Sequence, residues 1–171
     1  MPIDATRAAL IEVVDRHVRA EVAQDVDGVM ATICAQPHYE VQPLGLVMTS
    51  TAAVREFYQR LLYMMGEKIP ADPGKVATSD ADDLDSSIFL TTGDYMIGQS
   101  GGQAGLVLRD RWRVQKPTGI EYHKSLALFL LDEKSRLLKG EHIYLNAGSA
   151  AVFKQALGEE FANLPGVTLE R

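Results

Sequence analysis

The segment from residue 121 to residue 146 constrains the fold of this chain more than any other stretch. It reads EYHKSLALFLLDEKSRLLKGEHIYLN, and two runs rich in Leu, Ile, Phe and Tyr flank the polar residues 132–136. Two apolar runs joined by a short charged segment predict an antiparallel β-hairpin with a tight turn. We expect this hairpin to form the floor of the fold.

Successive side chains of a strand point to opposite faces, so each strand of this hairpin has two faces. One face of the first strand has a polar end and an apolar end, which suits the lining of a pocket: His123, Ser125, Ala127, Phe129 and Leu131. The other face is Tyr122, Lys124, Leu126, Leu128 and Leu130. In the second strand His142, Tyr144 and Asn146 alternate with Glu141, Ile143 and Leu145. Such a polar row predicts either ligand contacts or a solvent-exposed face of the strand.

Length and composition restrict the class of protein. A chain of 171 residues has the size of one ordinary domain, and we expect a single domain over residues 1–171. The net charge of −6 argues against a nucleic-acid partner, because phosphate contacts need clustered Lys and Arg. No apolar stretch approaches the ~20 residues of a membrane span. The single cysteine excludes an internal disulfide bond, and we expect a cytoplasmic protein.

The remaining elements follow from hydrophobic periodicity. Helical spacing predicts helices at residues 6–23 and 26–33 and a third helix after the capping residues 49–51, and Ser149 is expected to cap a closing helix. Alternation predicts strands at 38–42, 88–97 and 104–115, with a loop over 66–85 and a glycine-rich turn at 98–102. Helices followed by long antiparallel strands predict an α+β fold, with the helices on one face of a bent sheet.

This order resembles the nuclear transport factor 2-like superfamily, which includes steroid delta-isomerases, limonene epoxide hydrolase and the SnoaL-like polyketide cyclases. The resemblance covers nearly the whole chain through loose motifs: VDRHV at 14–18, DVDG at 25–28, PLG at 43–45, AVREFY at 53–58, LDEKSRL at 131–137 and EHIYLN at 141–146. It implies a cystatin-like cone, in which a strongly bent antiparallel sheet wraps around the N-terminal helices and a conical pocket opens between them.

The isomerase chemistry of that superfamily is not expected here. The resemblance places the tyrosine donor, the aspartate base and the second acid of the isomerases at His17, Gln42 and Ala127. An amide and a methyl group cannot exchange the protons that an enolate mechanism requires. Tyr58 matches a tyrosine that supports the donor network in some isomerases, and it is equally compatible with a core aromatic whose hydroxyl lies at the rim.

A different set of polar residues is expected on the pocket side. If Gln42 faces the pocket, Glu40 faces it too, and so do His123 and Ser125 on the central strand. We predict Glu40 as the general base, with His17 or His123 as its partner, because burial raises the pKa of a carboxyl group toward neutrality. The alternative places Glu40 at the open mouth of the cone, paired with a surface cation.

The expected ligand contacts depend on which face of the last strand points inward. A difference of one residue in the length of the turn decides whether His142 and Tyr144 or Glu141 points into the pocket, and we prefer the first. The substrate-binding candidates are therefore Gln42, Tyr58, Ser125, Phe129, His142 and Tyr144. The histidines show no paired spacing such as HxH or HExxH, so we expect no metal site, and we expect no cofactor.

Two functions fit these residues. The first is a small enzyme of the SnoaL-like kind, which isomerises, cyclises, hydrates or dehydrates an apolar carbonyl or polyketide-like compound by proton transfer. The second is a non-catalytic ligand-binding or dimerisation module of the same fold. The apolar face formed by Leu126, Leu128 and Leu130 needs a cover, so we also predict a homodimer through this face.

Overall fold

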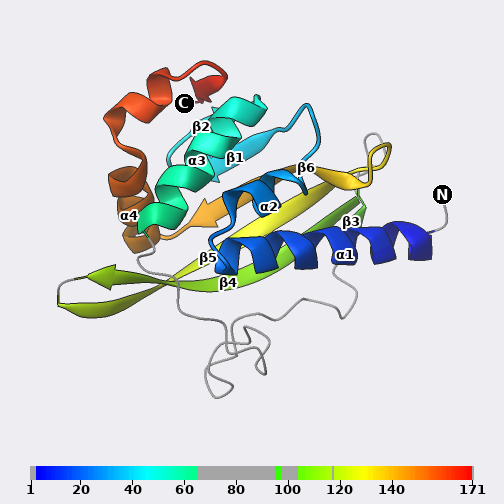
Figure 1. Cartoon of the computed structure of the whole chain (residues 1–171), viewed down its shortest axis with the longest axis horizontal. Helices are drawn as coiled ribbons and strands as arrows, with labels where there is room; N and C mark the ends of the chain where they lie inside the picture. The colour runs from blue at the N-terminus through cyan, green and yellow to red at the C-terminus, as the bar shows by residue number, and fades with distance from the viewer. Residues whose placement is uncertain (1–2, 65–94, 98–103, 117, 171) are drawn as a thin grey trace.

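A computed structural model describes residues 3–64, 95–97, 104–116 and 118–170 of the chain (Figure 1). Its helices are α1 (Ile3–Val22), α2 (Val26–Met30), α3 (Thr51–Met64), α4 (Ala147–Leu157) and the 3-10 helix η2 (Glu159–Asn163). Its strands are β1 (Tyr39–Gln42), β2 (Leu46–Met48), β3 (Tyr95–Ile97), β4 (Ala104–Lys116), β5 (Gly119–Asp132), β6 (Leu137–Leu145) and β7 (Val167–Leu169). Among the described residues, no helix combines the length and the apolar character needed to cross a membrane.

The strands form one curved sheet, in the order β3-β4-β5-β6-β1-β2-β7. The predicted hairpin is the pair β5–β6 near its centre, and β1 lies parallel to β6 while the other neighbouring strands are antiparallel. Figure 1 shows α1, α2 and α3 on one side of this sheet. We call the sheet face toward these helices the inner face and the opposite one the outer face. The predicted α+β fold, a bent sheet around N-terminal helices, is confirmed.

The faces of β5 agree with the alternation in the sequence. Ala127, Phe129 and Leu131 are buried on the inner face, whereas Tyr122 and Leu126 are exposed on the outer face. The turn between β5 and β6 is closed by the Asp132 carboxylate, which accepts hydrogen bonds from the backbone and the hydroxyl of Ser135. These bonds stabilise the charged carboxylate and lower the pKa of Asp132.

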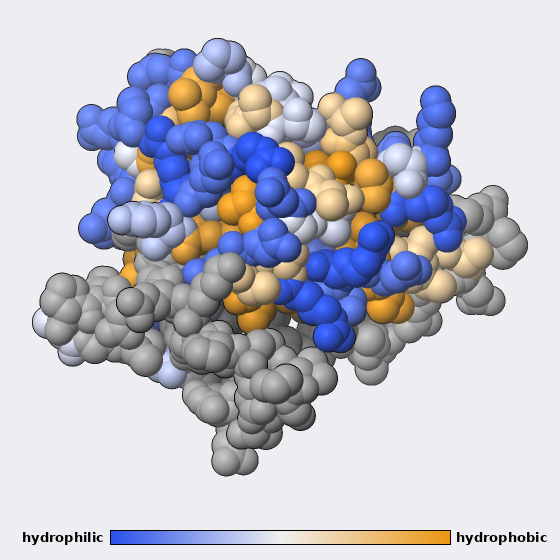
Figure 2. Space-filling model, viewed as in Figure 1, coloured by the Kyte–Doolittle hydropathy of each residue, from blue (hydrophilic) through white to orange (hydrophobic). Residues whose placement is uncertain are grey.

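Helix α1 covers the inner face as its apolar spacing predicts. Leu10, Val13, Val14 and His17 are buried on the side toward the sheet, and exposed polar residues such as Arg16 face away from it. The space-filling view accordingly shows mainly hydrophilic side chains along this helix (Figure 2). His17 is therefore a fully buried polar residue on a mainly apolar helix face.

The buried apolar residues form two clusters. One joins α1 to β4, β5 and β6, and it includes Leu10 and Phe129; the other joins α3 to β1, β2 and the C-terminal helices, and it includes Phe57 and Tyr58. The ring of His17 contacts Phe129 of the first cluster and Tyr58 of the second, with centroids 5.8 and 5.5 Å apart. His17 thus lies at the junction of the two halves of the core.

Several element predictions need correction. Helix α2 ends at Met30 and not at residue 33 as predicted. Strands β2 and β7 were not predicted, because each is only three residues long. Asn146, not Ser149, caps α4: the Asn146 side chain accepts a hydrogen bond from the Ser149 backbone, and the Ser149 hydroxyl donates to the carbonyl oxygen of Lys124. Of the strand predicted at 88–97, the structure describes residues 95–97, while the loop at 66–85 and the glycine-rich turn at 98–102 lie outside the described residues.

Candidate functional site

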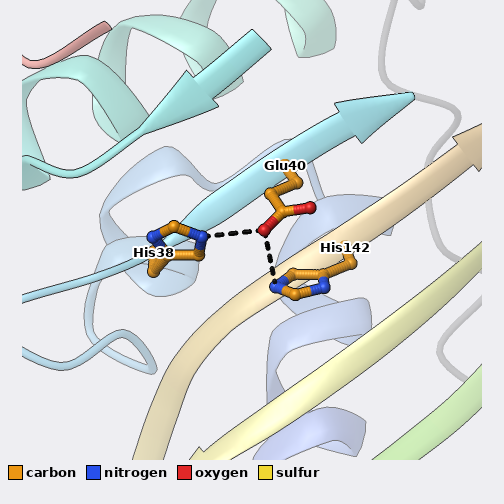
Figure 3. Close-up of side chains that lie close together, drawn as sticks. All are labelled: His38, Glu40 and His142. Carbon is orange, nitrogen blue, oxygen red and sulfur yellow. Dashed lines mark hydrogen bonds and ion pairs between the residues drawn. The ribbon is translucent and has the colours of Figure 1, made fainter. Parts of the chain in front are cut away.

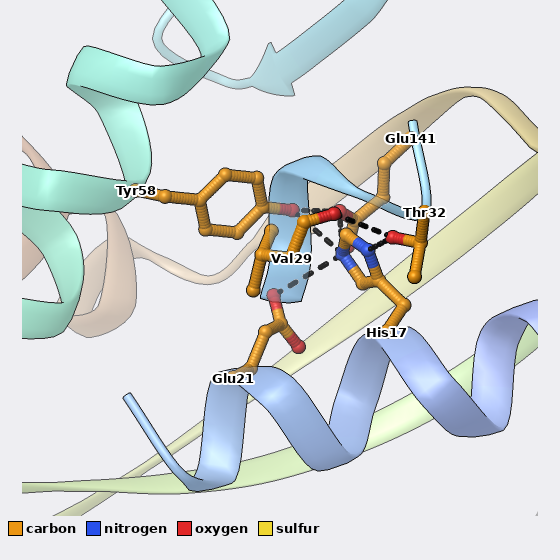
Figure 4. Close-up of polar contacts among 6 residues, drawn as sticks. All are labelled: His17, Glu21, Val29, Thr32, Tyr58 and Glu141. Carbon is orange, nitrogen blue, oxygen red and sulfur yellow. Dashed lines mark hydrogen bonds and ion pairs between the residues drawn. The ribbon is translucent and has the colours of Figure 1, made fainter. Parts of the chain in front are cut away.

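Five polar side chains from four parts of the chain meet on the inner face, and we call them the inner cluster. They are His17 and Glu21 of α1, Thr32 after α2, Tyr58 of α3 and Glu141 of β6 (Figure 4). His17 and Glu21 are four residues apart and so share one side of the helix. The side chains of His17 and Glu141 are 0% and 6% exposed, whereas Glu21 is 27% exposed and connects the cluster to the surface.

Hydrogen bonds join four members of the inner cluster in one line. His17 Nδ1 lies 2.7 Å from Thr32 Oγ1, and His17 Nε2 lies 2.9 Å from the Tyr58 hydroxyl. That hydroxyl lies 2.8 Å from Glu141 Oε2. The carboxylates of Glu21 and Glu141 also lie 3.6 and 3.9 Å from His17 Nε2. Both ring nitrogens of His17 therefore have partners inside the protein.

Counting protons along this line assigns the donors. The Thr32 hydroxyl donates to the carbonyl oxygen of Val29, so it accepts from His17, and Nδ1 carries a proton. The single hydroxyl proton of Tyr58 then points either to Glu141 or to His17 Nε2. In the first case His17 is an imidazolium facing a carboxylate, and in the second it is neutral and Glu141 carries the proton. The two arrangements differ by the shift of two protons, one across each hydrogen bond of Tyr58.

The tyrosine in the middle of the line stays protonated. Burial raises the pKa of Tyr58 well above its ordinary value, and the negative charge of Glu141 raises it further. Burial and then the Glu141 charge likewise raise the pKa of Tyr39, whose ring packs edge-on against Tyr58 with centroids 6.2 Å apart. A neutral phenol between an imidazole and a carboxyl group passes a proton on without becoming a base itself.

A second group of three side chains lies on the outer face, and we call it the outer cluster. It consists of His38 just before β1, Glu40 on β1 and His142 on β6 (Figure 3). Their side chains are 40%, 24% and 21% exposed. His38 and Glu40 are two residues apart and share one side of the chain, and Glu40 pairs with His142 across the parallel strands.

The two histidines of the outer cluster converge on one carboxylate oxygen. His38 Nε2 lies 2.8 Å from Glu40 Oε1, and His142 Nε2 lies 3.6 Å from the same atom. The two imidazole rings are 5.8 Å apart in an edge-on arrangement. Burial lowers the pKa of His142, with the Glu40 charge opposing the shift and His38 adding to it. His142 is therefore predominantly neutral near pH 7.

The predicted set of pocket residues is divided between the two faces of the sheet. Tyr58 and Phe129 lie beside His17, and the Tyr58 hydroxyl lies inside the network and not at a rim. Glu40 and Gln42 alternate with the buried Tyr39 and Val41 and so lie on the outer face, as do His142 and Tyr144. The expected pairing of Glu40 with His17 or His123 was wrong, because the sheet separates them.

A β-bulge explains why the inward face of β6 was predicted wrongly. In the turn Asp132 pairs with Leu137, and that register continued along the hairpin would place His142 opposite Ala127 on the inner face. The pairing shifts by one residue between Leu130 and Leu131, so Glu141 instead lies opposite Phe129. A one-residue shift moves every later side chain to the other face, and Glu141, not His142 and Tyr144, points inward.

His123 and Ser125 share the inner side of β5 with Phe129, but they lie farther along the strand. Six residues separate His123 from Phe129, which corresponds to about 20 Å of strand. The His123 ring stacks on Trp112 with centroids 4.7 Å apart, and Trp112 contacts Phe153 of α4. His123 Nε2 lies 3.6 Å from a carboxylate oxygen of Glu121. The structure thus brings His17, Glu40 and His123 to three separate places.

Comparison with known proteins supports the fold and not a specific activity. No protein-family model matches the sequence, and no curated protein matches it significantly. Solved structures match it over most of their length: PrhC from Penicillium brasilianum (TM-score 0.59, 12% identity, 95% of this chain and 99% of that one) and BvnE pinacolase from Penicillium brevicompactum (0.59, 14%, 91% and 95%). A proposed SnoaL-like polyketide cyclase from Shewanella denitrificans also matches (0.50, 12%, 85% and 96%). The chain has the fold that these proteins share, as the resemblance to the nuclear transport factor 2-like superfamily implied.

Proposed function

We propose that the inner cluster performs general acid–base catalysis on a small, mostly apolar carbonyl or polyketide-like compound. The reaction would be an isomerisation, cyclisation, hydration or dehydration that needs no organic cofactor. The observation that carries this proposal is the line from His17 Nε2 through the Tyr58 hydroxyl to Glu141 Oε2, with steps of 2.9 and 2.8 Å. Such a line joins a proton donor to a proton acceptor inside the protein.

The chemistry follows from the proton count. In the charged arrangement, His17 Nε2–H donates to the carbonyl oxygen of the substrate in place of Tyr58, and the Glu141 carboxylate takes a proton from the carbon next to that carbonyl. The substrate becomes an enol, His17 becomes neutral and Glu141 becomes protonated. Return of the Glu141 proton to a different carbon, while the enol O–H proton goes back to His17 Nε2, isomerises the substrate and restores both groups. If the enol instead reacts within the molecule, the Tyr58 hydroxyl carries the Glu141 proton back to His17.

Two further observations support an enzyme. The buried ring of Phe129 packs edge-on against His17, so one side of the imidazole has an apolar neighbour. The fold is also that of BvnE, which is a pinacolase, and of a proposed SnoaL-like cyclase. At 12–14% identity these neighbours suggest the reaction class but not the substrate.

Hydrogen–deuterium exchange at carbon tests this proposal without knowledge of the natural substrate. A panel of apolar ketones and β-dicarbonyl compounds would be incubated with the protein in D2O, and exchange next to the carbonyl would be followed by NMR. We expect wild-type protein to accelerate exchange for a subset of the panel and Glu141→Gln, which removes the proposed base, to lower that rate by about 100-fold. Glu133→Gln, in the exposed β5–β6 turn, is the control and should retain the wild-type rate. Equal rates for Glu141→Gln and wild type would contradict the proposal.

The exposed apolar residues of the outer face favour a second function, a dimerisation module. Leu126 and Tyr144 are 39% and 45% exposed and pair with each other across β5 and β6. We propose a homodimer that covers this face, with or without catalysis on the inner face. Light scattering at micromolar concentration should give twice the monomer mass, and Leu126→Lys should restore the monomer. Val22→Lys, at an exposed apolar position of α1, is the control; a monomeric wild type would end this proposal.

A further inference from the structure

The outer cluster has the ligand types of a transition-metal site. We propose that His38, Glu40 and His142 together bind a divalent transition-metal ion, with Zn²⁺ as the ion that fits best. One donor atom from each of the three residues lies within 4.8 Å of the other two. The nitrogens nearest the Glu40 Oε1 atom are His38 Nε2 and His142 Nε2. Two imidazoles and one carboxylate form a frequent three-ligand set for zinc, with a further coordination position for water or another ligand.

The spacing of the donors is close to that of a tetrahedral site. Zinc bonds to nitrogen and oxygen of about 2.0–2.1 Å at the tetrahedral angle place neighbouring donors about 3.3 Å apart. The distances from Glu40 Oε1 to the two histidine nitrogens, 2.8 and 3.6 Å, fall on either side of this value. Rotations of the side chains would bring the donors to this spacing.

An unsatisfied atom supports the site independently of the spacing. His142 Nε2 is shielded from solvent, and it has no hydrogen-bond partner among the described residues. Buried polar nitrogens are nearly always bonded, so an exception calls for an explanation. A metal ion between the three side chains would supply the missing bond. His38 Nε2, which donates to Glu40, would ligate the ion after its proton has moved to Nδ1 or has been released.

The backbone holds the three residues in place. The His38 amide donates to the carbonyl oxygen of Lys139 at 2.8 Å, which ties the residue before β1 to β6. A Cβ atom at Gly140 would lie only 1.6 Å from the His38 carbonyl oxygen, so this close approach requires glycine. Glu40 and His142 are fixed opposite each other by the parallel pairing of β1 and β6. The backbone positions of the three residues are therefore fixed before an ion arrives.

One other group of described residues has donors close enough for a metal ion, namely His17, Glu21 and Glu141 of the inner cluster. Its histidine differs from His142, because His17 Nδ1 is bonded to Thr32 and Nε2 to Tyr58. A metal ion there would have to break a hydrogen bond between fully buried groups. The outer cluster requires no such loss at His142, so we assign the ion to the outer face.

Zinc titration of the tag-free protein tests the proposal. The protein would be treated with a chelator, dialysed and titrated with Zn²⁺ by calorimetry, and Co²⁺ would serve as a probe whose visible absorption reports the coordination geometry. We expect one ion per chain, with an affinity lower by about 100-fold or more in His142→Ala and in Glu40→Gln. Glu133→Gln removes the same charge from an exposed turn and should retain the wild-type affinity.

Three results would overturn the assignment. The first is an absence of stoichiometric binding by folded wild-type protein. The second is an affinity of His142→Ala and Glu40→Gln equal to that of Glu133→Gln, which would indicate nonspecific attraction to an acidic protein. The third is loss of binding in Glu21→Gln with retention in His142→Ala, which would place the ion in the inner cluster. Circular dichroism of each variant distinguishes a lost site from a lost fold.

Discussion

The two faces of β6 carry two clusters of histidine and glutamate with opposite properties. Glu141 points inward to His17 and Tyr58, and the next residue, His142, points outward to Glu40 and His38. The inner histidine is bonded at both ring nitrogens, whereas the outer His142 has a shielded nitrogen without a hydrogen bond among the described residues. Similar residue types therefore suit different tasks: the satisfied line can move a proton within itself, and the unsatisfied one can receive a cation.

Replacing the histidine of each cluster should give the largest difference in stability between the inner and the outer cluster. We expect His17→Leu to lower the free energy of unfolding by about 3–5 kcal/mol, because it takes the imidazole away from the buried carboxyl group of Glu141 and from the hydroxyl groups of Thr32 and Tyr58. His142→Leu should change it by less than about 1 kcal/mol, since it removes a nitrogen that has no hydrogen bond. Urea denaturation of the metal-free proteins measures both values. Similar losses in the two variants would show that the clusters do not differ as described.

Gly140→Ala tests the link between β1 and β6 on which both clusters depend. The added Cβ would clash with the His38 carbonyl oxygen, and we expect a loss of about 1–3 kcal/mol in the free energy of unfolding. The variant should also weaken zinc binding, because His38 must move. Gly148→Ala is the matched control, since its Cβ would lie 3.4 Å from the nearest atom outside its helix, the Asn146 side-chain oxygen. A Gly140→Ala protein as stable as this control would contradict the close approach.

Tyr58→Phe separates the two ends of the inner line while it retains the packing of the ring. Removal of the hydroxyl takes a hydrogen-bond partner from His17 and from Glu141, and we expect a cost of about 1–3 kcal/mol in thermal or urea unfolding. Tyr63→Phe, at a position 86% exposed, should cost almost nothing. Zinc affinity should be the same in both variants, and a loss confined to Tyr58→Phe would connect the two clusters across the sheet.

The smallest expected effect is a shift in the titration of His142. The Glu40 carboxylate raises the pKa of His142 against the larger effect of burial, so Glu40→Gln should lower this pKa further. NMR titration of the metal-free protein would measure it, with Glu133→Gln as the control. A pKa of His142 that rises in Glu40→Gln would show that the carboxylate does not act on this ring.

The lowered pKa of His142 also makes the stability of the protein depend on pH. Because the pKa of His142 is lower in the folded than in the unfolded protein, the unfolded chain binds more protons between the two values. The contribution of His142 is therefore fully present above its unfolded pKa and is lost as the pH falls through its folded pKa. Unfolding curves at several pH values should show this loss in wild type and less of it in His142→Leu.

Much of the fold follows from local patterns. The hairpin of β5 and β6 and the helix that carries His17 could be predicted, because strand alternation and helical spacing record which side is buried. Alternation also grouped Glu40 with Gln42 on one face of β1, but that face was expected on the pocket side and lies on the outer face. The same patterns placed His17 and Phe129 correctly on the inner side. Strands of three residues, such as β2 and β7, carry too little alternation to be recognised, and the capping role of Asn146 was assigned to Ser149 three residues later.

The composition of the candidate sites was predicted less well, for a reason that lies in the hairpin. The single bulge between Leu130 and Leu131 exchanged Glu141 for His142 on the inner face. The parallel pairing of β1 with β6 then brought Glu40 to His142, although about a hundred residues separate them in the chain. The H-x-E spacing of His38 and Glu40 was present in the sequence, but His142, the third residue of the proposed metal site, lies on another strand.

The sequence by itself determined which residues are apolar, where the long elements run and that they form a bent sheet with helices on one face. These properties depend on the periods of helices and strands and on burial of apolar surface, which are local quantities. Only the tertiary structure decided which polar side chains meet. That outcome depends on strand register and on contacts between distant segments, and one extra residue at a bulge directs each following side chain to the opposite face.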